Sequence, residues 1–164
     1  MKKFIKWLFV ILVFLQAAVL IAGVVIFRMP LPDHDIDVSG LPLTDFVEVI
    51  RDERGIPHIY GTNVDDILFA QGYVHAQDRF WQLEFWSHLS TGRLASLIGE
   101  PGVGADLLFR TFGFNRVALE EYETLPPEFK QDLINYTDGI NAYIESRPQR
   151  SLSLEHFLLQ FINP

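Results

Sequence analysis

The sequence predicts an α+β chain, with a transmembrane helix, a short β-hairpin and then mainly helices. Three observations lead to this prediction. Residues 7–27 form an almost unbroken apolar run. Two short runs with strand-like composition flank a loop at residues 51–55. From residue 64 onward, apolar side chains recur three and four positions apart, which is the helical period.

The N-terminal apolar run has the length of a membrane-spanning helix. Residues 7–27 are interrupted only by Gln16, with three lysines before them and Arg28 after them. A bilayer core needs about 20 apolar residues, whereas the apolar part of a signal peptide has about 7–15. The basic N-terminus should stay cytoplasmic, which places the rest of the chain on the extracytoplasmic (periplasmic or outer) face. We therefore expect the chain to contact the membrane through residues 7–27.

A cleaved signal peptide is the alternative. Ala17-Ala18 and Ala22-Gly23 supply the small residues that a cleavage site needs, but they lie within the apolar run and not after it. We therefore favour an uncleaved anchor over secretion after signal cleavage, and both over a buried core helix. In either of the first two cases the remainder is exported.

The charge distribution limits the kinds of partner. All 21 Asp and Glu residues follow Arg28, whereas four of the 13 Lys and Arg residues lie at or before it. So acidic a remainder is a poor candidate for nucleic-acid binding, which depends on neutralising phosphates. The chain has no Cys, which excludes disulfides, thiolate zinc sites and a thiol nucleophile within it.

The segment after the apolar run has the composition of an extended linker. Residues 29–45 contain three prolines and one glycine among scattered acidic residues. We expect three parts in the chain: residues 1–28 as a transmembrane anchor or signal, residues 29–45 as an extracytoplasmic linker, and residues 46–164 as part of a folded domain.

Two short runs predict a β-hairpin. Residues 47–50 alternate between apolar and polar side chains, and residues 56–60 are rich in β-branched and aromatic ones. Gly55 supplies the glycine that a short hairpin loop needs. Pro57 cannot donate to a sheet ladder, so the second strand should lie at an edge or begin late.

A long aromatic helix should follow the hairpin. Asn63 and Asp66 have the spacing of an N-cap residue and an acidic residue in the first turn. Apolar residues then occupy more than one stripe, so we expect a helix that is buried on most of its circumference. Gly92 should end or bend this helix, and Gly99 should end a short turn at residues 94–98.

The rest of the chain predicts further helices. Residues 105–124 have a helical pattern, which Gly113 can divide in two. Pro126-Pro127 should begin the next helix and Arg147-Pro148 should end it. A final short element should occupy residues 151–161. The helix before it has an apolar face formed by Phe129, Leu133, Tyr136, Ile140 and Tyr143.

Several stretches resemble the penicillin acylase (penicillin amidase) family of N-terminal-nucleophile hydrolases. They are residues 49–52 with 55–60, residues 71–84 (Gln-Gly-Tyr-Val-His-Ala-Gln-Asp-Arg-Phe-Trp-Gln-Leu-Glu), residues 92–95 and, more weakly, residues 136–143. The resemblance covers the first part of that family's α-chain and implies the N-terminal fragment of an αββα fold. In one departure, Pro126 stands where the family usually has the Ser or Thr that caps a helix.

The polar residues of these stretches are interpreted as structural. Asp78 and Arg79 should form an internal ion pair or a set of carbonyl contacts that locks the helix to the rest of the fold. His75 should be a hydrogen-bonded core residue. The family-motif residues expected to be structural are Arg51, Asp52, Gly55, Pro57, His58, Gly72, His75, Gln77, Asp78, Arg79, Gln82, Glu84 and Gly92.

The chain offers few residues for chemistry of its own. His75 and Asp78 stand three apart, and His88 follows Glu84 by four. A zinc site would need three or four converging ligands, and no H-E-x-x-H spacing occurs. None of the seven serines lies in a G-x-S-x-G elbow. We therefore expect no catalytic and no metal residue in this chain, and its substrate-binding residues are unknown.

The resemblance implies a mechanism whose parts lie beyond these residues. Family members are made as one precursor that cuts itself and exposes a Ser at the start of a β-chain. This Ser attacks an amide carbonyl with its own α-amine as the base. The chain should then be the N-terminal part of a hydrolase for acyl side chains of β-lactams or related N-acyl compounds, with its own β-chain as partner. Calcium in the intact protein is left open, and residues 1–164 alone should be inactive.

A membrane-tethered helical binding or scaffold module without catalytic activity is the alternative. The two hypotheses differ in how residues 44–164 should behave when expressed alone. A scaffold should be monodisperse and unfold cooperatively. A fragment should aggregate or be molten, because aromatic faces meant for the β-chain would be exposed.

Overall fold

The computed structural model describes residues 2–35 and 37–162, which form a mostly helical chain with a short two-stranded antiparallel sheet. Two single turns of 3-10 helix, η1 (Glu100–Gly102) and η2 (Gln149–Ser151), precede α4 and α7. The helices and strands follow the predicted order: α1 (Lys2–Arg28), β1 (Glu48–Arg51), β2 (Pro57–Tyr60), α2 (Val64–Ser90), α3 (Ala95–Ile98), α4 (Val103–Phe112), α5 (Phe114–Thr124), α6 (Pro127–Glu145) and α7 (Leu154–Ile162).

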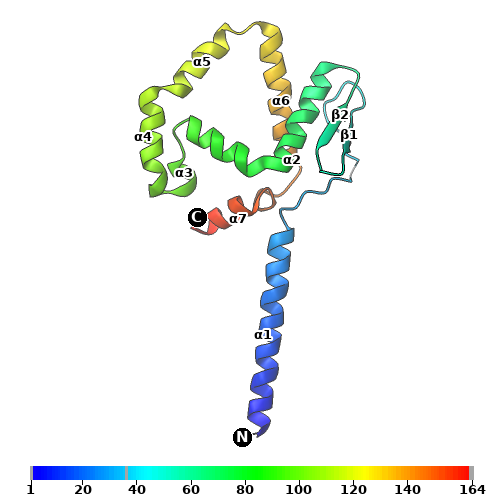
Figure 1. Ribbon diagram of the computed structural model, residues 1–164, viewed down its shortest axis with the longest axis vertical. Coiled ribbons are helices and arrows are strands. Elements are labelled where there is room, and N and C mark those ends of the chain that lie inside the picture. Colours follow the sequence, from blue (N-terminus) through cyan, green and yellow to red (C-terminus); the bar gives the residue numbers. More distant parts are fainter. Residues whose placement is uncertain (1, 36, 163–164) are drawn as a thin grey trace.

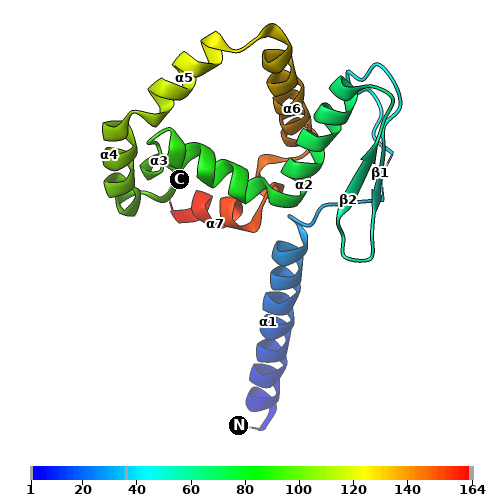
Figure 2. The ribbon, with the colours of Figure 1, turned by 45° about the horizontal axis from the view of Figure 1, so that its top comes forward.

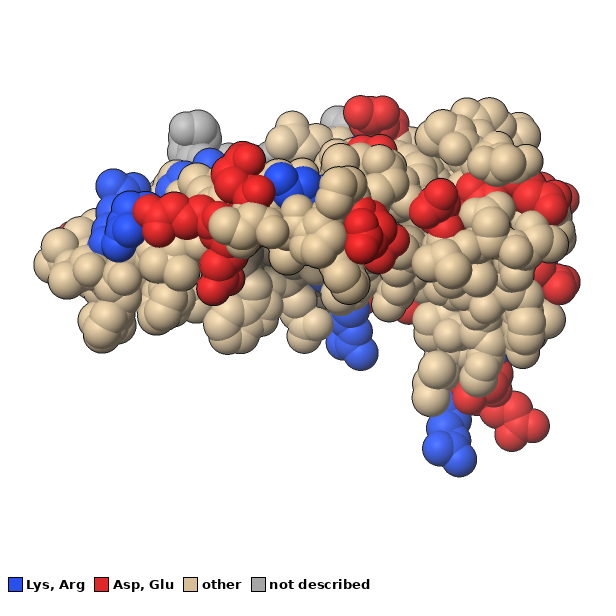
Figure 3. Space-filling view, turned by 90° about the horizontal axis from the view of Figure 1, so that it is seen from above, with Lys and Arg blue, Asp and Glu red and all other residues tan. Residues whose placement is uncertain are grey.

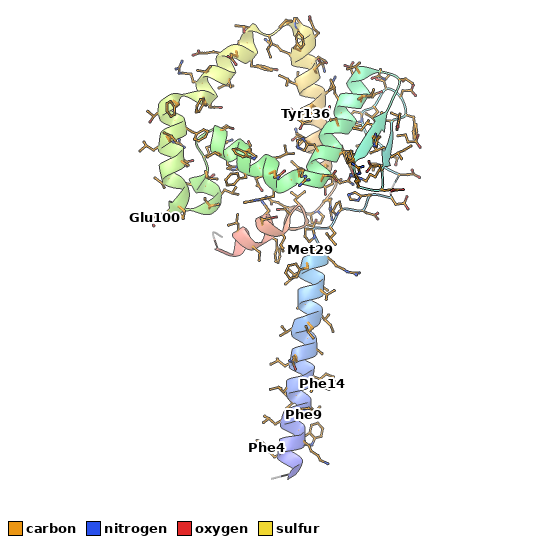
Figure 4. All side chains as sticks on the ribbon, in the orientation of Figure 1. Phe4, Phe9, Phe14, Met29, Glu100 and Tyr136 are labelled. Atoms are coloured by element: carbon orange, nitrogen blue, oxygen red, sulfur yellow. The ribbon has the colours of Figure 1, made fainter. Side chains whose placement is uncertain are left out.

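α1 projects from the rest of the molecule as a stem (Figure 1). Its stretch Lys6–Arg28 is long and apolar enough to cross a membrane, and the most apolar window within it has a mean hydropathy of 2.9. No part of its most apolar window is buried inside the molecule, and the labelled phenylalanines stand along the stem in Figure 4. Length and composition fit a signal sequence or a membrane anchor.

The hairpin forms where the sequence predicts it. β1 and β2 pair antiparallel, with Glu48 opposite Tyr60 and Arg51 opposite Pro57. Pro57 is the first residue of β2, where a strand tolerates a missing N–H. Gly55 turns the loop with a φ of +77°, a conformation that glycine adopts without steric cost.

α2 begins with the predicted cap. The Asn63 side chain accepts a hydrogen bond from the Asp66 backbone nitrogen at 2.8 Å and donates one to the Asp66 carboxylate at 2.6 Å. The buried Asp66 also accepts hydrogen bonds from the backbone nitrogens of Thr44 and Asp45, at 3.0 and 2.9 Å. This carboxylate therefore joins the start of α2 to the segment that leads into β1.

α2 is kinked, which its sequence pattern did not predict. Arg79 has φ −138° and ψ 28°, outside the helical region. Before the kink Phe69, Tyr73 and Ala76 are buried, whereas after it Trp86 is 62% exposed. The prediction of burial around most of the helix is right for its first half and wrong for its second. The reason is that α6 and the hairpin both pack closely against the first half of α2.

The crossing of α2 and α6 holds the core. A Cβ atom on Gly72 would overlap the carbonyl oxygen of Tyr136, and one on Gly139 would overlap a carbonyl oxygen of α2. Tyr143 of α6 is 2% exposed, and its ring meets that of Tyr73 edge to face with centroids 5.4 Å apart. Both glycines thus allow a backbone contact that any side chain would prevent.

α4, α5 and α6 form an arc that leaves this core and returns to it (Figures 1 and 2). Gly113, with a φ of +74°, separates α4 from α5 as predicted. α6 begins at Pro127 after Pro126, which makes no side-chain cap. Many large apolar side chains of the arc are 47–69% exposed: Leu107, Leu108, Phe112, Phe114, Leu119, Phe129 and Leu133.

The predicted apolar face of α6 is covered only toward its C-terminal end. Tyr143 is buried and Ile140 is half-buried, whereas Phe129 and Leu133 are 55% and 47% exposed. Among the described residues, α2 covers the end of this face and leaves its beginning open. The sequence pattern located the face correctly but could not show what covers it.

The C-terminal part of the chain lies next to the kink of α2 and the end of α1 (Figures 1 and 2). α7 confirms the predicted final element. Ser153 precedes it, and its Oγ accepts a hydrogen bond from the backbone nitrogen of His156 at 2.9 Å, which is the geometry of an N-cap. The side chain of Phe161 lies outside the described structure, as do residues 163 and 164.

Candidate functional site

Arg51, at the end of β1, holds the hairpin on α2. Its Nη1 and Nη2 donate to the two carboxylate oxygens of Asp78 at 2.9 and 2.8 Å, and Nη2 also donates to Oε1 of Gln77 at 2.9 Å. A further bond reaches the carbonyl oxygen of Gly55 at 3.1 Å. A guanidinium that binds a carboxylate through both terminal nitrogens is fixed in orientation. These contacts therefore set the angle between hairpin and helix.

The expected ion pair exists for Asp78 but not for Arg79. The partner of Asp78 is Arg51, and His34 Nε2 lies 3.5 Å from the same carboxylate. Neighbouring residues on a helix point in different directions, so Arg79 does not share this contact. Within residues 2–35 and 37–162, Arg79 forms no ion pair and is exposed at the kink. The prediction was wrong for this residue.

Asp52 organises the hairpin loop. Its Oδ1 accepts hydrogen bonds from the backbone nitrogens of Ile56 and Arg54, both at 2.9 Å. These bonds, the one from Ile56 foremost, hold the pKa of the Asp52 carboxyl below its ordinary value of 3.8. His58 Nε2 lies 3.7 Å from the other carboxylate oxygen, and half of its side chain is exposed. Asp52, Gly55 and His58 therefore all belong to this turn and its flank.

His75 lies on the surface, at the edge of the α2–α6 crossing. Its Nδ1 is hydrogen-bonded to the hydroxyl of Tyr136, which Figure 4 labels where α6 passes α2. Burial raises the pKa of the Tyr136 hydroxyl. The predicted hydrogen bond is confirmed. The predicted core position is wrong, because His75 stands beside the crossing and not beneath it.

Glu84 pairs with a residue far along the chain. Its two carboxylate oxygens lie 2.9 and 3.0 Å from Nδ1 of His156 in α7, and these side chains are 14% and 10% exposed. The ring of Phe80 packs edge-on against the imidazole at 6.0 Å. His88, which the sequence places near Glu84, bonds to its backbone carbonyl instead. The Glu84–His156 pair fastens α7 to the second half of α2.

The C-terminal end of α2 is fixed by a glycine and a buried acid. Gly92 has a φ of +64°, as its predicted role at the helix end requires, and its carbonyl accepts a hydrogen bond from Arg110 Nε at 2.6 Å. Asp106 of α4 accepts hydrogen bonds from the backbone nitrogens of Leu94 and Ala95, at 2.6 and 2.9 Å. Sequence reasoning missed Asp106, although it is only 8% exposed.

Two surface clefts flank the Arg51–Asp78 pair. One has a volume of about 530 Å³ and is lined by Arg79, Trp81 and Gln82, among others. The other has about 810 Å³ and lies between the segment before β1 and the first half of α2. Arg51 and Gln77 line both. Where residues 2–35 and 37–162 are concerned, no three His, Asp or Glu side chains converge as a metal ion requires.

Comparison with known proteins agrees with this organisation. The family model described as penicillin amidase matches residues 46–164. The penicillin acylase 2 proenzyme of Pseudomonas sp. (strain SE83) is 40% identical over 100 residues, which are 61% of this chain and 13% of that protein. Acyl-homoserine lactone acylase QuiP of Pseudomonas putida is 36% identical over 102 residues, which are 62% of this chain and 12% of that protein.

A third relative is also an acylase. Penicillin G acylase of Escherichia coli is 33% identical over 99 residues, or 60% of this chain and 12% of that protein. The chain thus spans only 12–13% of the length of these three relatives.

A solved structure has a similar fold. The thermostable penicillin G acylase from Alcaligenes faecalis superposes with a TM-score of 0.57 at 22% identity, and the match covers 72% of this chain and 71% of that one. Likeness at this identity concerns the fold alone. The family match over residues 46–164, together with the named acylases among the relatives, shows that the chain belongs to the penicillin amidase family of amide hydrolases.

Proposed function

We propose that residues 46–164 form the first part of the α-chain of a penicillin-amidase-type hydrolase that cleaves linear amides. The amides would be acyl side chains of β-lactams or related N-acyl compounds. A Ser outside residues 1–164, exposed by autoproteolysis at the start of a β-chain, would attack the amide carbonyl, and its free α-amine would take up the proton. Residues 46–164 would contribute helices and hairpin strands to an αββα sandwich.

The names of the relatives support this choice of substrate class. They are acylases of penicillin and of acyl-homoserine lactones, and both compounds carry an acyl group on an amide nitrogen. The choice among acyl groups would depend on the shape of a pocket. The motif residues from Arg51 to Gly92, apart from Arg79, would position the helices and the hairpin and would not react themselves.

The uncovered apolar side of α4, α5 and α6 carries the proposal within the structure. Leu107 and Phe112 are 69% and 62% exposed, and Phe129 is 55% exposed. Figure 3 views the molecule from the end opposite α1 and shows acidic side chains separated by broad uncharged areas. Soluble monomers rarely leave large apolar areas in water. In our proposal the β-chain covers this side.

We also propose that α1 remains attached and anchors the protein, with residues 46–164 on the extracytoplasmic face. The mean hydropathy of Lys6–Arg28 and the lysines before it support this. Secretion after signal cleavage remains the alternative. Intact-mass measurement of the protein from membranes distinguishes the two, because cleavage would remove at least part of residues 1–28.

An amide-hydrolysis assay on the full-length gene product tests the proposed activity. The processed protein is offered a penicillin and a series of acyl-homoserine lactones, and release of the free amine is followed. We expect turnover of at least one substrate, and its loss when the first residue of the β-chain is changed from Ser to Ala. Processed protein that hydrolyses none of these amides would contradict the proposed function.

A membrane-tethered helical scaffold is the second candidate function, and the anchor and the acidic surface are compatible with it. Expression of residues 44–164 alone separates the candidates. A scaffold would unfold cooperatively and stay monodisperse. The fragment that we propose would aggregate or bind a hydrophobic dye in a molten state. The exposure of Phe112 and Phe129 favours aggregation or a molten state.

A further inference from the structure

Arg147, just after α6, contacts the chain directly after α1. Its Nη2 donates to the carbonyl oxygens of Met29 and Leu31, each at 3.2 Å. Its Nη1 donates to the hydroxyl of Tyr143 at 2.8 Å, and the guanidinium lies 5.9 Å from the centroid of the Tyr143 ring. Because Tyr143 is 2% exposed, the core fixes the position of Arg147. Figure 4 shows Met29 where α1 meets the rest of the molecule.

The end of α1 is suited to hold a cation. The last carbonyls of a helix lack partners within the helix and carry partial negative charge. The Met29 nitrogen still bonds to the carbonyl of Val25, so Met29 directly follows the last turn of α1 and stays bonded to it. Pro30 and Pro32 follow the two acceptor carbonyls and restrict the backbone. A planar guanidinium can therefore bind both carbonyls of this stiff segment at once.

Further contacts bind the same segment to the domain. We call residues 29–35 and 37–45 the strap; they contain no helix and no strand. Near the beginning of the strap, the Asp33 carbonyl accepts a hydrogen bond from Gln77 Nε2 at 2.9 Å. At its end, the strap donates two backbone hydrogen bonds to the buried Asp66, at 3.0 and 2.9 Å. The strap is thus bonded to Arg147 and α2 in its first five residues and to α2 again in its last two.

A strap that is hydrogen-bonded to the domain limits how far the domain can turn relative to α1, whereas a flexible linker does not. A free chain as long as residues 29–45 would have a root-mean-square end-to-end distance of roughly 20–25 Å and many orientations. Such a linker would leave the domain free to turn relative to α1. Bonds at both ends of the strap, at residues 29–33 and at residues 44 and 45, restrict this freedom.

We propose that Arg147 and the strap form a rigid mount, which fixes the domain in one orientation on the membrane in which α1 is embedded. The face turned to the lipid then consists of the strap, the kink of α2 and α7, the elements nearest α1 in Figures 1 and 2. The connection between α5 and α6 lies at the opposite end (Figure 1). This inference rests on the proposed anchoring by α1.

Two side chains of the lipid-facing surface, Arg79 and Trp81, are of kinds that favour the headgroup layer of a membrane. The 530 Å³ cleft lies on this face and is lined by Pro30, Arg79 and Trp81, among others. Arg79 is exposed at the kink, where its guanidinium can reach a phosphate. Tryptophan and basic residues are the side chains that favour the boundary between membrane and water.

Distances between two spin labels test the mount. The full-length gene product is placed in lipid nanodiscs with labels on Gln16→Cys in α1 and Glu128→Cys in α6, both exposed positions. Residues 1–164 contain no other cysteine, and any cysteine elsewhere is replaced by serine. We expect one narrow distance distribution for the otherwise unchanged protein. Arg147→Gln should broaden it about twofold or more, toward the spread of a free chain.

Two further variants make the result specific. Tyr143→Phe keeps the core ring and removes the hydroxyl that holds Arg147, so it should also broaden the distribution, even if Arg147→Gln fails to fold. Arg116→Gln changes an arginine that is 68% exposed and pairs with Glu120 on its own helix, so it should leave the distribution narrow.

Three results would overturn the mount. They are a broad distribution in the otherwise unchanged protein, a narrow one in both Arg147→Gln and Tyr143→Phe, and the absence of residues 1–28 from the mature protein. Amide hydrolysis by the same preparations reports separately on the proposed function. A narrow distribution in an inactive protein would contradict that function and leave the mount supported.

Discussion

Arg51 of β1 and Asp78 of α2 are joined through both terminal nitrogens of the guanidinium and both oxygens of the carboxylate, at 2.8 and 2.9 Å. They are 27 positions apart in the chain, and their side chains are only 16% and 24% exposed. A two-stranded hairpin is marginally stable by itself. This contact with α2 therefore helps to hold the hairpin in place.

Arg51→Lys tests the importance of the two-nitrogen contact. Lysine keeps the charge but offers a single point of contact, so we expect the free energy of local opening at residues 47–60 to fall by about 1–2 kcal/mol. Hydrogen exchange of these residues in the full-length protein measures this. Arg54→Lys, at an exposed loop position, is the control and should change the opening energy by less than about 0.5 kcal/mol. Equal effects of both changes would contradict the assigned role of Arg51.

Gly139→Ala tests the backbone contact between α2 and α6. The added Cβ atom would overlap the carbonyl oxygen of Phe69, so the helices must separate, at a cost of about 1–3 kcal/mol or more. Gly104→Ala in α4 is the control, because a Cβ atom there meets nothing within 4 Å and removes the conformational cost of a helical glycine, about 0.5–1 kcal/mol. Thermal unfolding should shift down for the first and up for the second. A shift in the same direction would count against the crossing.

The ionised Asp66 carboxylate should stabilise the fold at neutral pH, and this stabilisation should be lost in acid. Hydrogen bonds to its carboxylate, from the Thr44 nitrogen first and from Asn63 next, hold its pKa below the ordinary value of 3.8. A lowered pKa in the folded state means that this stabilisation is complete above 3.8 and is lost as the pH falls through the folded value. Asp66→Asn should therefore be less stable at neutral pH and lose less on acidification.

Urea unfolding at neutral pH and near pH 3 measures this difference. Asp65→Asn, one residue earlier at an exposed position, is the matched control and should retain the acid loss of the parent protein. An Asp66→Asn protein that loses as much stability in acid as the parent would show that the Thr44 and Asn63 bonds do not govern this carboxyl.

Glu84→Gln tests the attachment of α7. The amide keeps one acceptor oxygen but loses the second oxygen that contacts the His156 imidazole and the negative charge, so we expect the opening energy of α7 to fall by about 1–3 kcal/mol. Hydrogen exchange at residues 154–162 measures it. Glu155→Gln, at an exposed position of α7 itself, should have little effect. If Glu155→Gln opens α7 as much as Glu84→Gln, the pair is not what holds the helix.

Local sequence signals predicted local structure. Asn63 and Asp66 located the start of α2, and Gly55, Gly92 and Gly113 located turns or breaks that the positive φ values confirm. These features depend on residues within a few positions of one another. Their physical causes, caps and backbone conformations, can therefore be inferred from neighbouring residues.

Contacts between distant segments could not be predicted. Glu84 and His156 are 72 positions apart, and no periodicity links them. The kink at Arg79 and the exposure of His75 depend on which helix packs where. Gly139 did offer a signal, since a glycine within a helical pattern often marks a close approach. Asp106, a lone acid beside two leucines, offered a weaker one.

The first residue of the second chain tests the central claim most directly. The full-length precursor is purified and incubated, and N-terminal sequencing follows the products of its cleavage. We predict one internal cut beyond residue 164 that leaves Ser as the new N-terminal residue, with amide hydrolysis appearing as the cut proceeds. A precursor that stays uncut, or that hydrolyses amides equally well before the cut, would contradict the assignment of this chain to an autoproteolytic amide hydrolase.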